Sequence, residues 1–353
     1  MADPYLKLIA KKDIPSKKNG LNICVFADFN IAGNLTLITS LINKYTIHKA
    51  RCIIVVGDYL DYGKDIVLID GKAKNSKQTI DEVSASEAAD VIKKADFFHI
   101  GRHAVNFADI HFENIFNQNN CVFQYFGSHL RDNTKAIREF HEGSGIHGVS
   151  WVDWTMQENA GPMHYHLPDI FDTESVTPWF ESAPDMKMDP IIIAHSPTNR
   201  AFKKTNFFLE IIEKLKKEFN IELLLLEGLS NEECLKRKGT AHILFDQISV
   251  GRFALSAIES MAMSQVVLCS VSNIVQSVFP EHPVISVTKN TLEQELRALI
   301  ADKDKILNVG VKGRKWVKKY CDPIRAIKQW VYLYDLIING NRIIENDDFF
   351  INI

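Results

Sequence analysis

The chain alternates short apolar runs, rich in β-branched residues, with longer stretches of helical character, and this alternation constrains its fold more than any other feature. The apolar runs span residues 23–26, 52–56, 97–100, 121–126, 191–194, 223–226, 243–245 and 266–269. Such runs with helical stretches between them are typical of parallel strands joined by crossover helices. The sequence therefore predicts an α/β fold.

One segment interrupts this series of strands. Residues 167–190, LPDIFDTESVTPWFESAPDMKMDP, contain four prolines and no steady apolar period, as connections between domains do. We expect two doubly wound, Rossmann-like domains, at residues 1–170 and 190–323, with a linker at 171–189 and ligands bound in a cleft that both domains face. Apolar side chains at helical spacing predict a C-terminal helix, within residues 324–353, that crosses back to the first domain.

The charge balance and the cysteine content limit the functions and the location that the sequence allows. The 41 basic and 44 acidic residues leave a net charge of −3, which argues against a dedicated polyanion binder but leaves a local basic groove open. The six cysteines have no CxxC spacing and suit reduced thiols, so we expect a cytoplasmic protein. No stretch resembles a signal peptide or an integral membrane segment, while peripheral membrane contact and the oligomeric state stay open.

Two cations lie in the turn that follows the strand at 191–194. The segment HSPTNRAFKKT leads from this strand into an amphipathic helix and carries Arg200 and Lys203. The N-terminus of a helix favours anions, and two cations beside it would complete a diphosphate site. The alternative is that both side chains are solvated surface cations.

A second turn has the same character. In FDQISVGRFALSAIESMAMSQVVLC, a glycine precedes a run of good helix formers, and the helix leads into a strand. The N–H groups of Gly251, Phe253, Ala254 and Leu255 could hold phosphate oxygens, and Glu259 could accept hydrogen bonds from a vicinal diol such as ribose. For Glu259, a solvated helix face and a partly buried carboxylate that needs a partner are equally open.

The order of these motifs resembles a known family. The succession of a strand, NRAFKKT, a helix, LLLLEG and FDQISVGRFALSAIESMAMSQVVLC is similar to the donor-binding domain of retaining GT-B glycosyltransferases of the group 1 (glycogen synthase and sucrose synthase-like) superfamily. Arg200, Lys203 and the ESMA run at 259–262 match the motif positions of that family. The NIAGN segment at 30–34 resembles its glycine-rich loop.

The resemblance implies a GT-B fold and roles for individual residues. Arg200 and Lys203 would be catalytic, neutralising the departing diphosphate of the donor, and Glu259 would bind the ribose. Gly33 and Asn34 would lie beside the donor phosphates. The donor would be a nucleotide-sugar, with UDP or GDP as the nucleotide, and neither a metal nor a tightly bound cofactor is expected.

The sequence also departs from the family pattern at the sugar. Gly251 stands where the family usually has a glutamate that touches the transferred sugar, Phe126 stands where it often has a histidine, and Lys204 replaces a glycine. Polar contacts to the sugar or the acceptor would then come from His99, His103, Ser128 or His129.

We therefore expect a glycosyltransferase that acts with retention of configuration on a glycan, lipid-linked or cell-envelope acceptor. Three alternatives stay open: a phage-type glycosyltransferase that modifies DNA bases, a nucleotide-sugar epimerase of the same fold, and a non-catalytic nucleotide-sugar binding protein.

Overall fold

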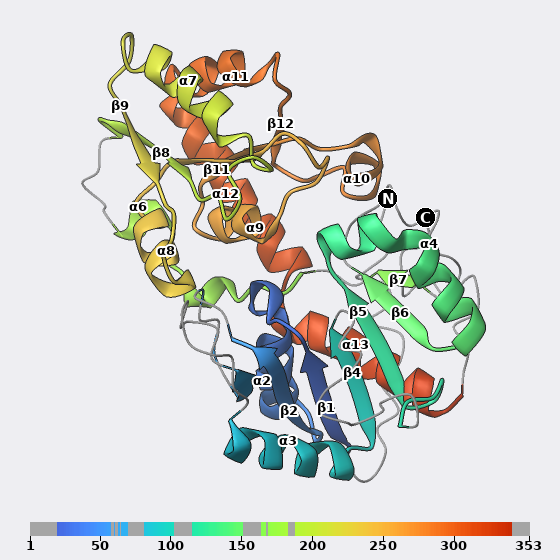
Figure 1. Cartoon of the computed structure of the whole chain (residues 1–353). Helices are drawn as coiled ribbons and strands as arrows, with labels where there is room; N and C mark the ends of the chain where they lie inside the picture. The colour runs from blue at the N-terminus through green and yellow to red at the C-terminus, as the bar shows by residue number, and fades with distance from the viewer. Residues whose placement is uncertain are drawn as a thin grey trace. The chain divides into compact units, whose positions relative to one another are not determined.

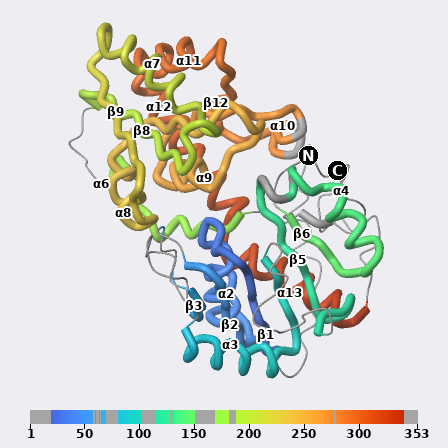
Figure 2. Tube along the Cα trace, viewed as in Figure 1, coloured from blue at the N-terminus to red at the C-terminus, as the bar shows by residue number. Residues whose placement is uncertain are grey.

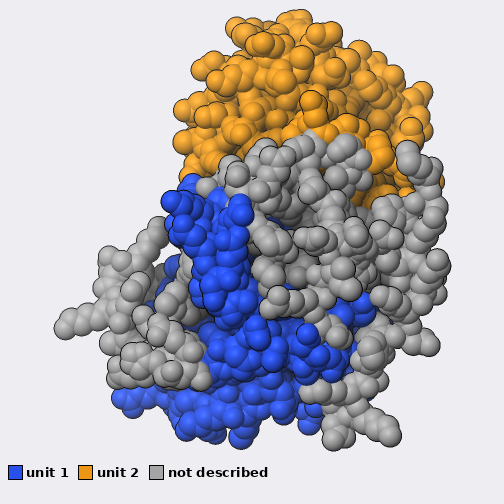
Figure 3. All heavy atoms as spheres, turned by 90° about the vertical axis from the view of Figure 1, so that its right-hand side faces the viewer, with its two compact units in different colours: residues 1–170, 323–353 blue, residues 171–322 orange. Residues whose placement is uncertain are grey.

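The chain forms two compact units, each built on one parallel β-sheet. The computed structural model describes residues 20–57, 60, 63, 65–69, 81–101, 115–150, 164–166, 169–182 and 188–340. Unit 1 comprises residues 1–170 and 323–353, and unit 2 comprises residues 171–322 (Figure 3). The two parallel sheets with their helices confirm the predicted α/β fold class (Figure 1).

The sheet of unit 1 has seven strands in the order β3-β2-β1-β4-β5-β6-β7, and all neighbours are parallel. The strands are β1 (Asn22–Ala27), β2 (Lys49–Val56), β3 (Ile66–Ile69), β4 (Phe97–Gly101), β5 (Cys121–Tyr125), β6 (His147–Ser150) and β7 (His164–His166). The strand order reverses between β1 and β4, and in open α/β sheets ligands bind at the carboxyl ends of strands beside such a reversal.

Helices cover both faces of this sheet. Alternate residues of β1 belong to different hydrophobic clusters, one shared with α2 (Asn34–Tyr45) and α13 (Pro323–Ile338), the other with α3 (Glu82–Lys94) and α4 (Gly127–Ser144). The C-terminal helix α13, drawn in red, lies beside the strands of unit 1 in Figure 2. The expected return of the last helix to the first unit is therefore present.

His99 on β4 ties α13 to the sheet. Its Nδ1 is 2.7 Å from the Tyr334 hydroxyl, and its Nε2 is 2.9 Å from Oε1 of Gln124 on β5. The imidazole also stacks on Trp330, with ring centroids 4.4 Å apart. Because every one of these side chains is buried, the contacts fix the position of α13 on the sheet.

Buried histidines make the stability of the protein depend on pH. Burial lowers the pKa of His99 to about 3 and the pKa values of His195 and His242 to about 4, whereas an unfolded chain has a histidine pKa of about 6.5. Folding therefore excludes protons that the unfolded chain binds. The stabilisation is complete above about pH 6.5 and is lost as the pH falls towards the folded pKa values, by about 1.4 kcal/mol per pH unit for each ring.

We expect urea unfolding measured between pH 5 and 6 to show this loss directly. The variant His99→Gln should have a slope of unfolding free energy against pH that is smaller by about 1.4 kcal/mol per pH unit, because one excluded proton is gone. An identical slope in the variant and the wild type would contradict the assignment of His99 as a neutral core residue.

The sheet of unit 2 has five parallel strands in the order β12-β11-β10-β8-β9. They are β8 (Ile191–His195), β9 (Ile221–Leu225), β10 (Ile243–Gln247), β11 (Val266–Cys269) and β12 (Ile285–Ser286). Helices α7 (Thr205–Leu215) and α11 (Leu292–Ile300) share one hydrophobic cluster with the strands. Helix α9 (Leu255–Ala262) contacts β10 and β11, and α12 (Lys303–Tyr320) contacts α9 and β11.

The segment expected to be a linker belongs to unit 2. It contains the short helices η3 (Thr173–Ser175) and α6 (Trp179–Ser182). Trp179 is buried, and its indole N–H donates to the carbonyl of Ser264 at 2.8 Å. Arg314 of α12 donates to the carbonyl of Thr173 at 2.9 Å. The described part of this segment thus packs on α12 and on the turn before β11.

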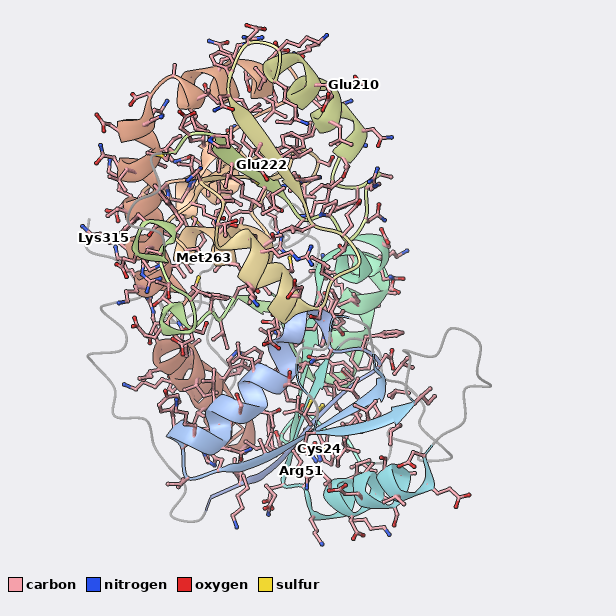
Figure 4. All side chains as sticks on the ribbon, turned by 90° about the vertical axis from the view of Figure 1, so that its left-hand side faces the viewer. Cys24, Arg51, Glu210, Glu222, Met263 and Lys315 are labelled. Carbon is pink, nitrogen blue, oxygen red and sulfur yellow. The ribbon has the colours of Figure 1, made fainter. Side chains whose placement is uncertain are left out.

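The remaining helices of unit 2 are α8 (Asn231–Lys238) and α10 (Asn273–Val278). Glu210 of α7 and Lys315 of α12 are exposed and project away from the unit (Figure 4). Within the described part of the chain, none of the helices combines the length and apolar character needed to cross a bilayer.

Candidate functional site

The candidate site of unit 2 lies at the carboxyl ends of β8 and β10. The chain enters the sheet at β8, adds β9 on one side and then adds β10 on the other, so the strand order reverses between β8 and β10. Arg200 and Lys203 follow β8, Asp246 lies in β10, and Glu259 lies in α9, directly after β10. The charged side chains that the sequence singled out thus follow the two strands where a ligand is expected.

Lys203 and Asp246 form a buried ion pair across this point of reversal. The ammonium of Lys203 donates to Oδ1 of Asp246, and both side chains are nearly inaccessible to solvent. Oδ2 of Asp246 accepts the N–H of Ala254 at 3.0 Å, immediately before α9. Burial alone would raise the pKa of Asp246, but Lys203 and this N–H outweigh burial and hold the pKa below its usual value.

The expectation for Ala254 therefore needs a correction. Its N–H, which was expected to hold a phosphate oxygen, is occupied by Asp246. The Asp246 carboxylate holds both Lys203 and the amide before α9, as a phosphate oxygen would do.

Arg200 is exposed and held by a carboxylate of its own. Its Nε donates to Oε1 of Glu227 at 2.7 Å and its Nη2 to Oε2 at 2.5 Å, and Glu227 follows β9. The guanidinium lowers the pKa of Glu227. Because half of the Arg200 side chain is exposed, solvent screens this pair and an incoming anion can compete for the guanidinium.

The backbone before α7 has the shape that a glycine would favour. Lys204 has φ +55° and ψ +38°, a left-handed conformation, directly before α7 begins at Thr205. The resemblance places a glycine at this position, and the structure gives the physical reason for that choice.

Glu259 is a buried carboxylate with partners, which settles the alternative left open by its sequence. Its Oε2 accepts from the ammonium of Lys238, the last residue of α8. Its Oε1 accepts from the side-chain amide of Asn231 at 3.3 Å. Only 5% of Glu259 is exposed, so the carboxylate lies inside a polar cluster and not on a solvated helix face.

The loop between β10 and α9 is organised by Gln247. Its side-chain oxygen accepts the N–H groups of Ser249 at 2.5 Å and Val250 at 2.8 Å, and its side-chain nitrogen donates to the carbonyl of Arg252 at 2.6 Å. Gly251 has φ +74°, a conformation that other residues rarely adopt. The loop is therefore a defined turn that carries no carboxylate at position 251.

Phe253 and Leu255 complete this loop. The Phe253 side chain is buried and meets Trp316 edge to face, with ring centroids 5.3 Å apart. Leu255 is half-buried at the first position of α9. Phe253 thus anchors the turn through its side chain.

In unit 1, Gly33 and Asn34 occupy the equivalent turn after β1. Ala32 and Gly33 both have positive φ values, +53° and +69°, and α2 begins at Asn34. The buried amide of Asn34 donates to the carbonyl of Ile31 at 3.4 Å. The turn thus brings the N-terminus of a twelve-residue helix to the reversal point of the first sheet.

Of the four residues expected to contact the sugar or the acceptor, the structure describes the side chain of His99. His99 is fully buried, and both ring nitrogens bond within the protein, to Tyr334 and Gln124, so a core role replaces the expected ligand contact. His103 and the side chains of Ser128 and His129 lie outside the described residues.

The sequence did not identify three charged residues that pair with the predicted site residues: Asp246, Glu227 and Lys238. Each pairs with a predicted residue that is 21 to 43 positions away. In the described part of the chain, no group of three or more His, Cys, Asp and Glu side chains could hold a metal ion.

Comparison with solved structures found proteins that are similar over about 90% of this chain. It is similar to sucrose-phosphate synthase from Thermosynechococcus elongatus, with a TM-score of 0.58 and 13% identity over 90% of this chain and 99% of that one. It is also similar to an α-glucosyltransferase in complex with UDP-glucose and DNA containing an abasic site, with a TM-score of 0.58 and 14% identity over 90% of this chain and all of that one.

A UDP-N-acetylglucosamine 2-epimerase is similar as well, with a TM-score of 0.54 and 10% identity over 92% of this chain and 97% of that one. No family model and no curated protein matches the sequence. The two parallel α/β units and these likenesses show that the chain has the GT-B fold, as its motifs predicted.

Proposed function

We propose that the protein is a glycosyltransferase that moves a sugar from a nucleotide-sugar donor to an acceptor, with the donor bound by unit 2. The observation that carries the proposal is the pair of cations after β8, each held by a carboxylate: Arg200 by Glu227 and Lys203 by Asp246. Each carboxylate shows that the cation beside it can bind an anionic oxygen, and a diphosphate offers several such oxygens. Glu259 lies in the helix that starts at the same edge, as a ribose partner should.

In the proposed reaction, these residues stabilise the leaving group. As the bond between the anomeric carbon and the diphosphate oxygen breaks, negative charge grows on the diphosphate, and Arg200 and Lys203 would stabilise it. An acceptor hydroxyl forms the new bond to the same face of the anomeric carbon and gives its proton to the departing phosphate oxygen. This route needs no protein carboxylate at the sugar, which agrees with glycine at position 251, and it retains the anomeric configuration.

UDP is the nucleotide that we propose. The similar α-glucosyltransferase and a similar Anabaena protein, HepE, are both described in complex with UDP-glucose. For the acceptor we propose a glycan or cell-envelope precursor. Product analysis with UDP-glucose tests the reaction class, since a transferase forms a glycosylated acceptor and an epimerase releases an altered sugar without any acceptor.

We also propose a cytoplasmic location. All six cysteines are free, and all but Cys234 are buried. Unpaired buried thiols are typical of proteins that fold in a reducing compartment.

The exposed cation gives the cleanest test of the donor site. Arg200→Ala should weaken UDP binding about 10-fold to 100-fold, because a charge-assisted hydrogen bond to the diphosphate is lost, while the fold survives because Arg200 is exposed. Calorimetric titration of UDP, followed by GDP, measures the effect.

The matched control is Arg237→Ala, which removes another exposed arginine that is also paired with a glutamate, Glu233. Its affinity for UDP should equal that of the wild type. Unchanged UDP affinity in Arg200→Ala would remove this residue from the donor site.

A further inference from the structure

Lys238 is a lysine with no exposed surface, and it ends in the polar cluster behind the candidate site. A buried ammonium carries a large desolvation cost and is retained where it is paired and hydrogen-bonded. Lys238 belongs to none of the motifs that predicted the donor site. Its placement therefore needs an explanation of its own.

The ammonium of Lys238 has two partners. It donates to Oε2 of Glu259 and to the Ser256 hydroxyl, 3.1 Å away, both on α9. The Ser256 hydroxyl lies 2.8 Å from the hydroxyl of Ser196, directly after β8. One lysine thus joins α8 to α9 and, through Ser256, to the turn that carries the two diphosphate cations.

This arrangement gives the two oxygens of Glu259 different tasks. Oε2 faces the fully buried ammonium and is committed to it. In the described part of the chain, the partner of Oε1 is the half-buried amide of Asn231, at 3.3 Å, which is a long and weak hydrogen bond. A hydroxyl that donates to Oε1 would replace that weak contact, whereas nothing from solvent can replace Lys238.

We propose that Lys238 is a positioning residue that holds Oε2 of Glu259 and so leaves Oε1 for the ribose, and that the site thereby selects ribonucleotides over 2′-deoxyribonucleotides. The inference rests on the proposed nucleotide-sugar function. Lys238 touches no substrate, and it acts through Glu259.

Removal of the ammonium has a consequence that pure loss of packing would not have. Within the described cluster, the groups that face Glu259 are Lys238, Asn231 and Cys234 of α8 and Ser256 of α9, and only Lys238 carries a positive charge. A buried carboxyl without a cation has a raised pKa. In Lys238→Met, Glu259 would therefore be protonated at mildly acidic pH and would accept a hydroxyl proton poorly.

The experiment is calorimetric titration of UDP and 2′-deoxy-UDP at pH 6.0 and 8.5. The wild type should bind UDP at least about tenfold more tightly than 2′-deoxy-UDP at both pH values. In Lys238→Met the ratio of the two affinities should fall below about threefold at pH 6.0 and recover in part at pH 8.5. Both nucleotides carry the same diphosphate, so the ratio of their affinities does not change when the diphosphate titrates.

Three further variants keep the test decisive. Lys236→Met removes an exposed lysine of the same helix and should keep the wild-type ratio. If Lys238→Met does not fold, the double variant Lys238→Met/Glu259→Gln leaves no unpaired buried charge and should fold with a low ratio at both pH values. Lys238→Arg keeps the positive charge and should retain most of the preference.

The outcomes separate the two proposals. UDP binding with an unchanged ratio in Lys238→Met or the double variant overturns the role of Lys238 and leaves the proposed function standing. If neither nucleotide binds the wild type, the proposed UDP site is wrong and the role of Lys238 falls with it.

Discussion

Replacing Lys203 with methionine should lower the free energy of unfolding by about 3–5 kcal/mol and abolish sugar transfer. Lys203 is 8% exposed and its partner Asp246 is 3% exposed, so methionine would leave a carboxylate buried without its cation. The N–H of Ala254 and the thiol of Cys269 would remain as hydrogen-bond donors to that carboxylate, and neither carries a positive charge. Unlike Arg200, this cation of the proposed donor site is therefore expected to support both the fold and the chemistry.

Urea unfolding of Lys203→Met, Asp246→Asn and the double variant at pH 7 measures the stability effect. The double variant should recover most of the loss, because no unpaired charge is left, yet it should still transfer no sugar. If the single and double variants lose equal stability, the cost comes from packing and not from the buried charge.

The same pair predicts opposite responses to acid. In the wild type the pKa of Asp246 is lowered, so its stabilisation is complete above the unfolded pKa and is lost as the pH falls through the folded value. In Lys203→Met, burial outweighs the hydrogen bond from Ala254 and raises that pKa, so protonation relieves the buried charge as the pH falls. The difference in stability between variant and wild type should narrow at low pH.

The fold was largely predictable because its central strands are continuous apolar runs. Each of the expected runs, such as 52–56 and 243–245, lies within or overlaps an observed strand. The missed strand β3 reads IVLI and does carry that signal, whereas β6 and β12 lack it. Strand β6 reads HGVS and β12 spans only Ile285–Ser286, and neither offers a run long enough to differ from a loop. Their pairing is set by the neighbouring strand and not by their own residues.

The site was predictable only as far as local motifs reach. Arg200, Lys203 and Glu259 stand at characteristic positions in a strand, turn and helix order, whereas their partners come from other elements. Asp246 contacts Lys203 because β10 lies next to β8 in the sheet. Neither motif specifies this strand order. Lys238 reads from sequence as one of three basic residues at the end of α8, a pattern typical of a solvated helix end.

His99 was misplaced for the same reason. At the end of an apolar run it could as well face a ligand as the core, and the deciding contact is the Tyr334 hydroxyl, 235 residues away. Only the return of α13 to the first sheet buries the imidazole. The long connection of the chain, and not the local sequence, makes this histidine structural.

Trp330→Ala should destabilise unit 1 by about 3–5 kcal/mol, since it removes a large side chain that is 1% exposed. The indole stacks on His99 at 4.4 Å and lies 6.0 Å from the Tyr334 ring. Its loss opens a cavity beside the hydrogen bonds that hold α13. Water would then reach His99, and its pKa should rise from about 3 towards its usual value.

Urea unfolding and titration of the His99 ring by NMR measure the two effects separately. Ile324→Ala, at a position of α13 that is 43% exposed, should change stability by less than about 0.5 kcal/mol. A small loss in Trp330→Ala with an unchanged His99 pKa would mean that α13 rests on the sheet through its aliphatic residues alone. A large loss with a raised pKa would mean that the C-terminal helix is part of the core of the first unit, so that unit 1 cannot complete its fold until the chain has passed through unit 2 and returned.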